Sequence, residues 1–192
     1  MFDLEQFIVE CRWFAGRNEP GRILELMRAA VGAPESLKRA VTPLDAGVGV
    51  LDAPPLFRSS DLTVLNVTLR PGVLSIPHDH GMWAVIGIYE GQENNTFFRR
   101  SGAALENVNT REVRAGEAIL LGVEVVHAIE NPLPAQTLGL HVYGGDLFAA
   151  RRSMWSPHTG EAHPYDIPQF TRWSGELAKA RRAAAMAQEA RP

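Results

Sequence analysis

The feature that most constrains the fold is a series of short, apolar-rich segments between about residues 54 and 150, separated by glycine and proline turns. The segment 63–69 is rich in β-branched residues and is followed directly by Arg70-Pro71-Gly72, a typical turn sequence. Many short strands with regular turns are typical of a β-sandwich or barrel, so we predict a mainly β domain. The other segments expected to form strands are 83–89, 95–99, 111–113, 118–121, 125–129 and 137–143.

Sequences of a different character flank this β-rich region. Apolar residues recur at helical spacing within residues 1–40, so we expect helices there. Residues 151–170 carry the prolines and glycines of a loop, and the alanine- and arginine-rich stretch 175–192 is a candidate terminal helix. A chain of 192 residues suits a single domain, 1–192, with a helical segment (1–40), a β-barrel (54–150) and a C-terminal loop and tail (151–192).

Composition argues against several classes of partner. The formal net charge is −3, which suggests no nucleic-acid or membrane-surface partner. No apolar run approaches the ~20 residues of a membrane span, and the acidic start of the chain does not resemble a signal peptide. Cys11 is the single cysteine, so no internal disulfide can form. We therefore expect a cytoplasmic protein.

Three histidines form a candidate metal site. His78 and His80 are two residues apart, so on a β-strand their imidazoles would point to the same face. His127, on another expected strand, can supply a third ligand. Three neutral imidazoles suit iron, nickel, copper or zinc and leave coordination positions open, as a catalytic site requires. The pattern therefore predicts a metal-dependent enzyme.

These histidines belong to two longer motifs that resemble those of the cupins. The first cupin motif is matched by Gly72, His78, His80 and Gly91. The second is matched by Gly116, His127 and Asn131, although Gly122 and Glu124 replace its proline and glycine. The resemblance implies a cupin fold, which is a double-stranded β-helix or jelly-roll barrel, here preceded by N-terminal helices.

Within the cupins, the chain is most similar to the cysteine dioxygenase-like thiol dioxygenases. Ala84 occupies the position of the glutamate that most cupins use as a fourth ligand, and this branch keeps only the three histidines. The family's His-Asp-His core is present with Asp79 in the middle, and its Ser-x-His-x-Tyr segment is matched by His141 and Tyr143. Residues 81–87 resemble the bacterial branch that includes 3-mercaptopropionate dioxygenases.

The resemblance implies a reaction and a set of roles. His78, His80 and His127 would bind Fe(II), and a small thiol such as cysteine or 3-mercaptopropionate would react with O2 to give a sulfinic acid. Tyr143, supported by His141, would hydrogen-bond the substrate or the oxygen. Gly139 replaces the family's serine, so a hydrogen bond that orients His141 is lost or is supplied by another residue.

The substrate's carboxylate requires a cation, and the planar guanidinium of arginine matches it best. Three arginines are candidates, and the sequence does not choose between them: Arg58, Arg151 and Arg152.

Two alternatives to a thiol dioxygenase stay open at this point. The chain can be a non-catalytic, metal-binding cupin that binds or senses a small acid, an alternative that the replacement of the serine by Gly139 favours. It can also be a cupin enzyme with different chemistry, in which Tyr143 has no role. The sequence leaves the metal, the thiol and the oligomeric state undetermined, because histidine ligands alone do not select one metal.

Overall fold

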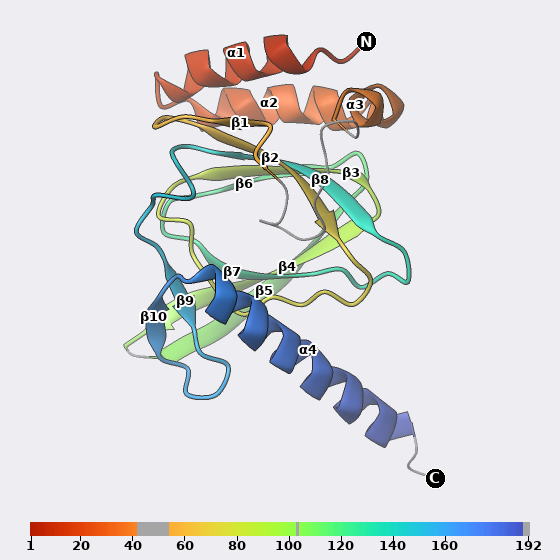
Figure 1. Ribbon diagram of the computed structural model, residues 1–192, viewed down its shortest axis with the longest axis vertical. Helices are drawn as coiled ribbons and strands as arrows, with labels where there is room; N and C mark the ends of the chain where they lie inside the picture. Colours follow the sequence, from red (N-terminus) through yellow and green to blue (C-terminus); the bar gives the residue numbers. More distant parts are fainter. Residues whose placement is uncertain (42–53, 103, 190–192) are drawn as a thin grey trace.

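The computed structural model describes residues 1–41, 54–102 and 104–189, so the expected start of the barrel at residue 54 borders a segment outside the described residues. Two facing sheets dominate this part of the chain (Figure 1). A five-stranded sheet has the order β1 (Phe57–Arg58), β2 (Thr63–Leu69), β8 (Thr137–Tyr143), β3 (Ala84–Glu90) and β6 (Ala118–Leu121). A three-stranded sheet has the order β5 (Ala104–Arg114), β4 (Gln92–Ser101) and β7 (Val126–Glu130).

The strand order confirms the predicted fold class. The barrel's pairings are antiparallel, and non-consecutive strands lie side by side, as where β8 runs between β2 and β3. This connection pattern closes two sheets into a jelly-roll barrel, and the chain therefore has the cupin double-stranded β-helix fold. Of the expected strands, 63–69, 118–121 and 137–143 have the observed bounds, whereas the strand expected at 111–113 extends over β5.

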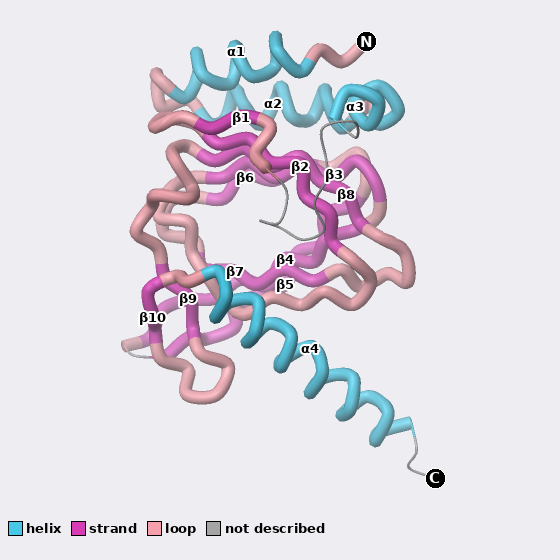
Figure 2. Tube along the Cα trace, in the orientation of Figure 1, coloured by secondary structure: helices cyan, strands magenta, loops and turns pink. Residues whose placement is uncertain are grey.

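Three N-terminal helices cover the outer face of the five-stranded sheet (Figure 2). They are α1 (Leu4–Ala15), α2 (Pro20–Val31) and α3 (Pro34–Val41). The amphipathic helix α2 buries Ile23, Met27 and Val31 completely. Gly87 of β3 permits this close packing, because a Cβ atom at Gly87 would lie 2.5 Å from Cγ of Met27.

Strands β2, β3 and β8 are buried along nearly their whole length because both faces of their sheet are covered. Outward side chains such as Leu140 and Val142 pack against the helices. Inward side chains such as Leu65 and Tyr143 belong to the barrel interior. Burying one Val or Leu side chain completely stabilises the fold by about 1.5–3 kcal/mol, so the helical layer is a major source of stability.

The C-terminal region is more ordered than the sequence predicted. Residues 151–170, expected to be a loop, contain the antiparallel pair β9 (Ser153–Trp155) and β10 (Ala162–Pro164). Besides β10, strand β9 also pairs with residues far away in the sequence: Trp155 N–H donates to the carbonyl of Pro77 at 2.9 Å. Long-range pairing of this kind leaves no local signal in a three-residue strand.

Helix α4 (Ile167–Glu189) begins eight residues before the expected helix start at residue 175. Asp166 caps it by accepting a hydrogen bond from Gln169 N–H at 2.9 Å, and Pro168 lies in the first turn, where proline is tolerated. The sequence Asp166-Ile167-Pro168 is therefore a local signal for the start of this helix. Of the helices in the described residues, none combines the length and apolarity needed to cross a membrane.

Candidate metal centre

The three predicted histidine ligands converge inside the barrel. His78 and His127 form an antiparallel bridge in which each backbone N–H donates to the other's carbonyl at 2.9 Å. His80 follows two residues later, outside any named strand. Two isolated bridges, from His78 to His127 and from His78 to Met154, therefore position the His-Asp-His segment in place of a full strand. All three imidazoles are buried, and one ring nitrogen of each lies within 4.8 Å of the others. This distance is compatible with one shared metal ion.

Hydrogen bonds orient two of these rings. Nδ1 of His78 donates to the Ile76 carbonyl at 3.1 Å, and Nδ1 of His127 donates to Oδ1 of Asn95 at 2.8 Å. Since both acceptors are oxygen atoms without protons, the two Nδ1 atoms carry the hydrogens and the Nε2 atoms keep free lone pairs. Nε2 of His127 lies 3.2 Å from Nε2 of His80. The rings thus direct lone pairs toward one point.

The three imidazoles are kept neutral. Burial lowers the pKa of His78 to about 4, with a smaller contribution from the charge of Arg152. Burial also holds the pKa values of His80 and His127 well below their usual range, and the neighbouring histidines lower them further. Neutral imidazole is the form that binds transition metals. The donor set therefore fits a divalent metal of the iron, nickel, copper or zinc class.

Asp79, between the two histidines, points away from them and anchors their segment. Its Oδ1 accepts a hydrogen bond from Ser153 N–H, and its Oδ2 accepts one from Arg100 Nη2, both at 2.7 Å. The Asp79 side chain thereby ties the ligand segment to β9 and to β4. This explains why an acidic residue is buried here without contributing to the cluster of histidine nitrogens.

Tyr143 and His141 of β8 lie beside the histidine cluster. The centroid of the Tyr143 ring is 5.1 Å from that of His80, and its hydroxyl is 3.1 Å from Nδ1 of His141. Burial raises the pKa of Tyr143 far above its ordinary value and lowers that of His141 to about 3. Both groups are therefore neutral at physiological pH. The pair has the geometry that the sequence predicted, a hydroxyl backed by an imidazole.

Two further polar residues of this region come from β4 and were missed by the sequence analysis. Asn95 orients His127, and its Nδ2 donates to Oε1 of Glu93 at 2.9 Å. Glu93 is fully buried, and burial raises its pKa to about 7. The expected strand began at Asn95 and thus left Glu93 out. An extension of its two-residue alternation backward from Phe97 would have placed both residues on the inner face.

Among the three candidate arginines, the structure brings Arg152 to the site. Arg58 donates to both carboxylate oxygens of Asp146, at 2.9 and 3.0 Å, so an internal partner already occupies its guanidinium. Arg151 is exposed. The guanidinium of Arg152 lies 3.5 Å from the centroid of the Tyr165 ring, and its charge lowers the pKa values of His78, His80 and Tyr143.

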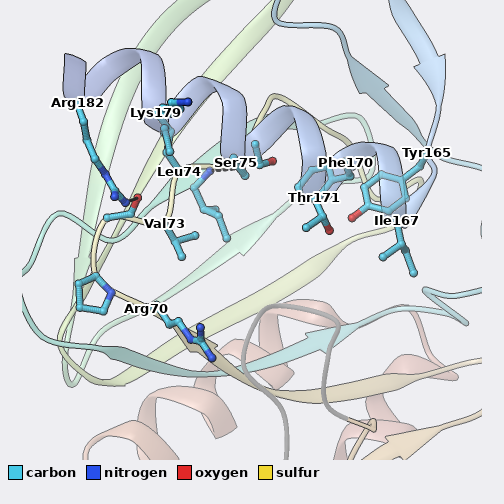
Figure 3. A pocket seen from close by; sticks show the side chains of 16 residues that line it. Arg70, Val73, Leu74, Ser75, Tyr165, Ile167, Phe170, Thr171, Lys179 and Arg182 are labelled. Carbon is cyan, nitrogen blue, oxygen red and sulfur yellow. Dashed lines mark hydrogen bonds between the residues drawn. The ribbon is translucent and has the colours of Figure 1, made fainter. Parts of the chain in front are cut away.

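Residues in and just before the first turn of α4 cover the histidine cluster on the His78 side. The ring centroids of Phe170 and Tyr165 lie 5.1 and 6.2 Å from that of His78. Both side chains also line a cavity of about 480 Å³ between α4 and residues 70–75 (Figure 3). Phe170 and Tyr165 thus contact both the histidine cluster and this cavity.

No family model matches the chain. One solved structure with a similar course of the chain is a protein with a double-stranded β-helix domain from Klebsiella pneumoniae subsp. pneumoniae MGH 78578. It is 15% identical with a TM-score of 0.44, and the match covers 57% of this chain and 80% of that one. An RmlC-like cupin from Methanocaldococcus jannaschii is 14% identical with a TM-score of 0.41, covering 49% of this chain and 79% of that one.

An enzyme is also among the similar structures. DMSP lyase DddQ from Ruegeria pomeroyi DSS-3 is 18% identical with a TM-score of 0.41, covering 52% of this chain and 45% of that one.

Proposed function

We propose that the protein is an Fe(II)-dependent thiol dioxygenase that converts a small thiol carboxylate, such as cysteine or 3-mercaptopropionate, into its sulfinic acid. In this reaction RSH and O2 give RSO2H, so the sulfur is oxidised by four electrons and both oxygen atoms end on it. The observation that carries the proposal is a cluster of three buried, neutral histidines with the Tyr143–His141 pair directly beside it.

Each residue has a defined task in this proposal. His78, His80 and His127 would hold Fe(II), which supplies a Lewis-acidic centre that favours thiolate formation and brings the thiol and O2 together. Arg152 would bind the substrate's carboxylate through its planar guanidinium, which the face of Tyr165 supports at 3.5 Å. The buried Tyr143 hydroxyl would hydrogen-bond the sulfur or the oxygen.

Oxygen consumption by protein loaded with Fe(II) under anaerobic conditions tests the reaction. Cysteine, 3-mercaptopropionate, homocysteine and cysteamine form the substrate panel, and cysteamine lacks the carboxylate. We expect O2 uptake with one of the carboxylate-bearing thiols, matched by an equal amount of sulfinate. Iron bound at one per chain without uptake for any thiol would instead favour a metal-binding cupin for a small acid.

The role of Arg152 has a matched control in its neighbour. Arg152→Gln removes the cation that lies at the site, whereas Arg151→Gln removes an exposed one. We expect Arg152→Gln to raise KM for the thiol carboxylate by about 10- to 100-fold, because a charge-assisted pair is lost. Arg151→Gln should leave KM within about 2-fold of the wild type. Equal effects of both variants would contradict the assignment of Arg152.

A further inference from the structure

Two buried polar atoms face each other inside the barrel without a hydrogen-bond partner among the described residues. They are Oε2 of Glu93, on β4, and Nε2 of His141, on β8, and they lie 3.8 Å apart. The Glu93 and His141 side chains are 0% and 2% exposed, so water does not compensate them freely. A buried polar group without a hydrogen-bond partner destabilises the folded state. Two such groups that face each other indicate a hydrogen bond that forms when the two side chains move slightly closer together.

Gly139 explains why the His141 ring can face β4. A Cβ atom at Gly139 would lie 2.9 Å from Nε2 of His141 and 3.0 Å from Cδ1 of Ile88. Any side chain at position 139 would therefore push the His141 ring away from its present place. The thiol dioxygenase pattern has a serine at this position, and its side chain would be incompatible with the present position of the His141 ring. The group that faces Nε2 of His141 is instead the carboxyl group of Glu93, which lies on the opposite sheet.

We propose that Glu93 is a positioning residue that holds His141 through Nε2 and thereby sets the direction of the Tyr143 hydroxyl. In the chain of contacts from Glu93 through His141 to Tyr143, the carboxyl group takes the place of the missing serine. The consequence for turnover rests on the proposed function, in which Tyr143 contacts the reactants. The arrangement of the three side chains does not depend on that function.

The protons in this chain have two consistent arrangements. With Glu93 ionised, His141 Nε2–H donates to Oε2 of Glu93, Nδ1 is bare, and the Tyr143 hydroxyl donates to Nδ1. With Glu93 protonated, its Oε2–H donates to Nε2, Nδ1–H donates to the Tyr143 oxygen, and the hydroxyl hydrogen is free to point into the site. The second arrangement holds one proton more, on the carboxyl group, and it shifts the imidazole to its other tautomer.

The surroundings of Glu93 favour access to both arrangements near neutral pH. Its pKa is raised to about 7 by burial, although the hydrogen bond from Asn95 partly opposes this. The titratable side chains that face the Glu93 carboxyl are His141 and Tyr143 of β8. Its pairing partner on β5 is the apolar Val113. A hydrogen bond between Oε2 and Nε2 requires these atoms to approach to ~3 Å, a movement smaller than 1 Å.

The direct test is the tautomer of His141 in chelator-treated, metal-free protein, read by two-bond ¹⁵N–¹H NMR of the imidazoles. A His141→Gln spectrum identifies the signal of His141. In the wild type we expect the proton of His141 to move from Nδ1 to Nε2 as the pH rises from about 6 to about 8. In Glu93→Gln it should stay on one nitrogen across this range. Glu112→Gln, which alters an exposed carboxylate on β5, should behave like the wild type.

Two variants keep the test decisive. Glu93→Asp retains a carboxyl group and should restore a pH-dependent tautomer, which a purely structural role of the side chain would not predict. If Glu93→Gln does not fold, Gly139→Ala gives the same readout, because its methyl group displaces the His141 ring from Glu93. A wild-type tautomer change that persists in Glu93→Gln or in Gly139→Ala would overturn the proposal.

Kinetics with iron-loaded protein then separates this inference from the proposed function. We expect Glu93→Gln to lower kcat by about 10- to 100-fold with KM within about 2-fold, because the substrate's contacts are unchanged. If the wild type shows no turnover with any thiol, the proposed function is wrong. The role of Glu93 is then judged from the NMR measurement of the His141 tautomer alone. Wild-type turnover together with an unchanged kcat in Glu93→Gln would overturn the role of Glu93 alone.

Discussion

The two faces of β8 perform different tasks in one strand of seven residues. On the outer face, Leu138, Leu140 and Val142 pack in the core beneath the N-terminal helices. On the inner face, His141 and Tyr143 contact each other beside the histidine cluster. Both faces are buried, yet one is uniformly apolar and the other depends on specific partners. Burial alone therefore does not distinguish a residue that stabilises the fold from one that builds the site.

The difference lies in what the neighbouring elements supply. The outer face needs only apolar volume, which α2 provides with Ile23, Met27 and Val31. The inner face needs partners with matching hydrogen-bonding groups, and these come from the opposite sheet at Glu93 and Asn95. We therefore expect variants of the two faces to fail in different ways: outer variants should lose stability, and inner variants should lose metal or turnover.

The largest effect is expected for His127→Ala. Removing one of the three candidate ligands and leaving Oδ1 of Asn95 without its hydrogen-bond partner should weaken metal binding by at least about 100-fold and abolish turnover. Metal content after dialysis and oxygen uptake measure both consequences. His158→Ala, which alters an exposed histidine paired with Glu176, should retain the metal. Stoichiometric iron in His127→Ala would exclude this residue as a ligand.

The outer face is tested by Leu140→Ala. Because Leu140 is completely buried beneath the helices, the truncation should lower the free energy of unfolding by about 2–5 kcal/mol. Urea denaturation measures the loss, and Leu120→Ala on β6, where the side chain is 38% exposed, is a control that should lose less than about 1 kcal/mol. Loss of iron from the folded fraction of Leu140→Ala would show that the two faces are not independent.

The pH dependence of stability provides a test of the inner face without any metal. The pKa of Glu93 is about 7 in the folded state, against 4.5 for the ordinary carboxyl group that represents the unfolded state. Between these values the folded state keeps a proton that the unfolded state has released, so the stabilising contribution of Glu93 is complete below about pH 4.5 and is lost as the pH rises through about 7.

The free energy of unfolding of chelator-treated wild type should therefore fall relative to that of Glu93→Gln by about 3 kcal/mol between about pH 4.5 and about pH 8. The buried histidines also titrate, with the opposite sign, but they are present in both proteins and cancel in the difference. Glu112→Gln should differ from the wild type by less than about 0.5 kcal/mol throughout. A difference that does not change with pH would contradict a raised pKa for Glu93.

The smallest of these effects is expected for Tyr143→Phe. The ring remains to fill its place beside His80, so the iron content and the fold should be unchanged. Loss of the hydroxyl should lower kcat for the thiol by about 10- to 100-fold, as is typical for one hydrogen-bonding group in an active site. Steady-state oxygen uptake measures the change. An unchanged kcat would remove Tyr143 from the mechanism and favour cupin chemistry of another type.

Local patterns predicted the elements that have strong periodicity. The apolar and β-branched character of residues 63–69 and 137–143 gave β2 and β8 their bounds, and helical spacing located the helices that precede the barrel. The strands within residues 151–170 were not predicted, because β9 is only three residues long and part of its pairing is with the distant Pro77 and Asp79. For the site, motif spacing selected the three histidines, which the fold then brings within 4.8 Å of one another.

The sequence by itself therefore determined the mainly β fold and the Tyr143–His141 pair, because both depend on spacing along the chain, and it identified the three histidines through their match to the cupin-like motifs. Only the tertiary structure decided that Arg58 pairs with Asp146 while Arg152 reaches the site, and that Glu93 faces His141. These outcomes depend on which strands oppose each other across the barrel. Residues separated by 48 positions, such as Glu93 and His141, meet only when the two sheets close around a common interior.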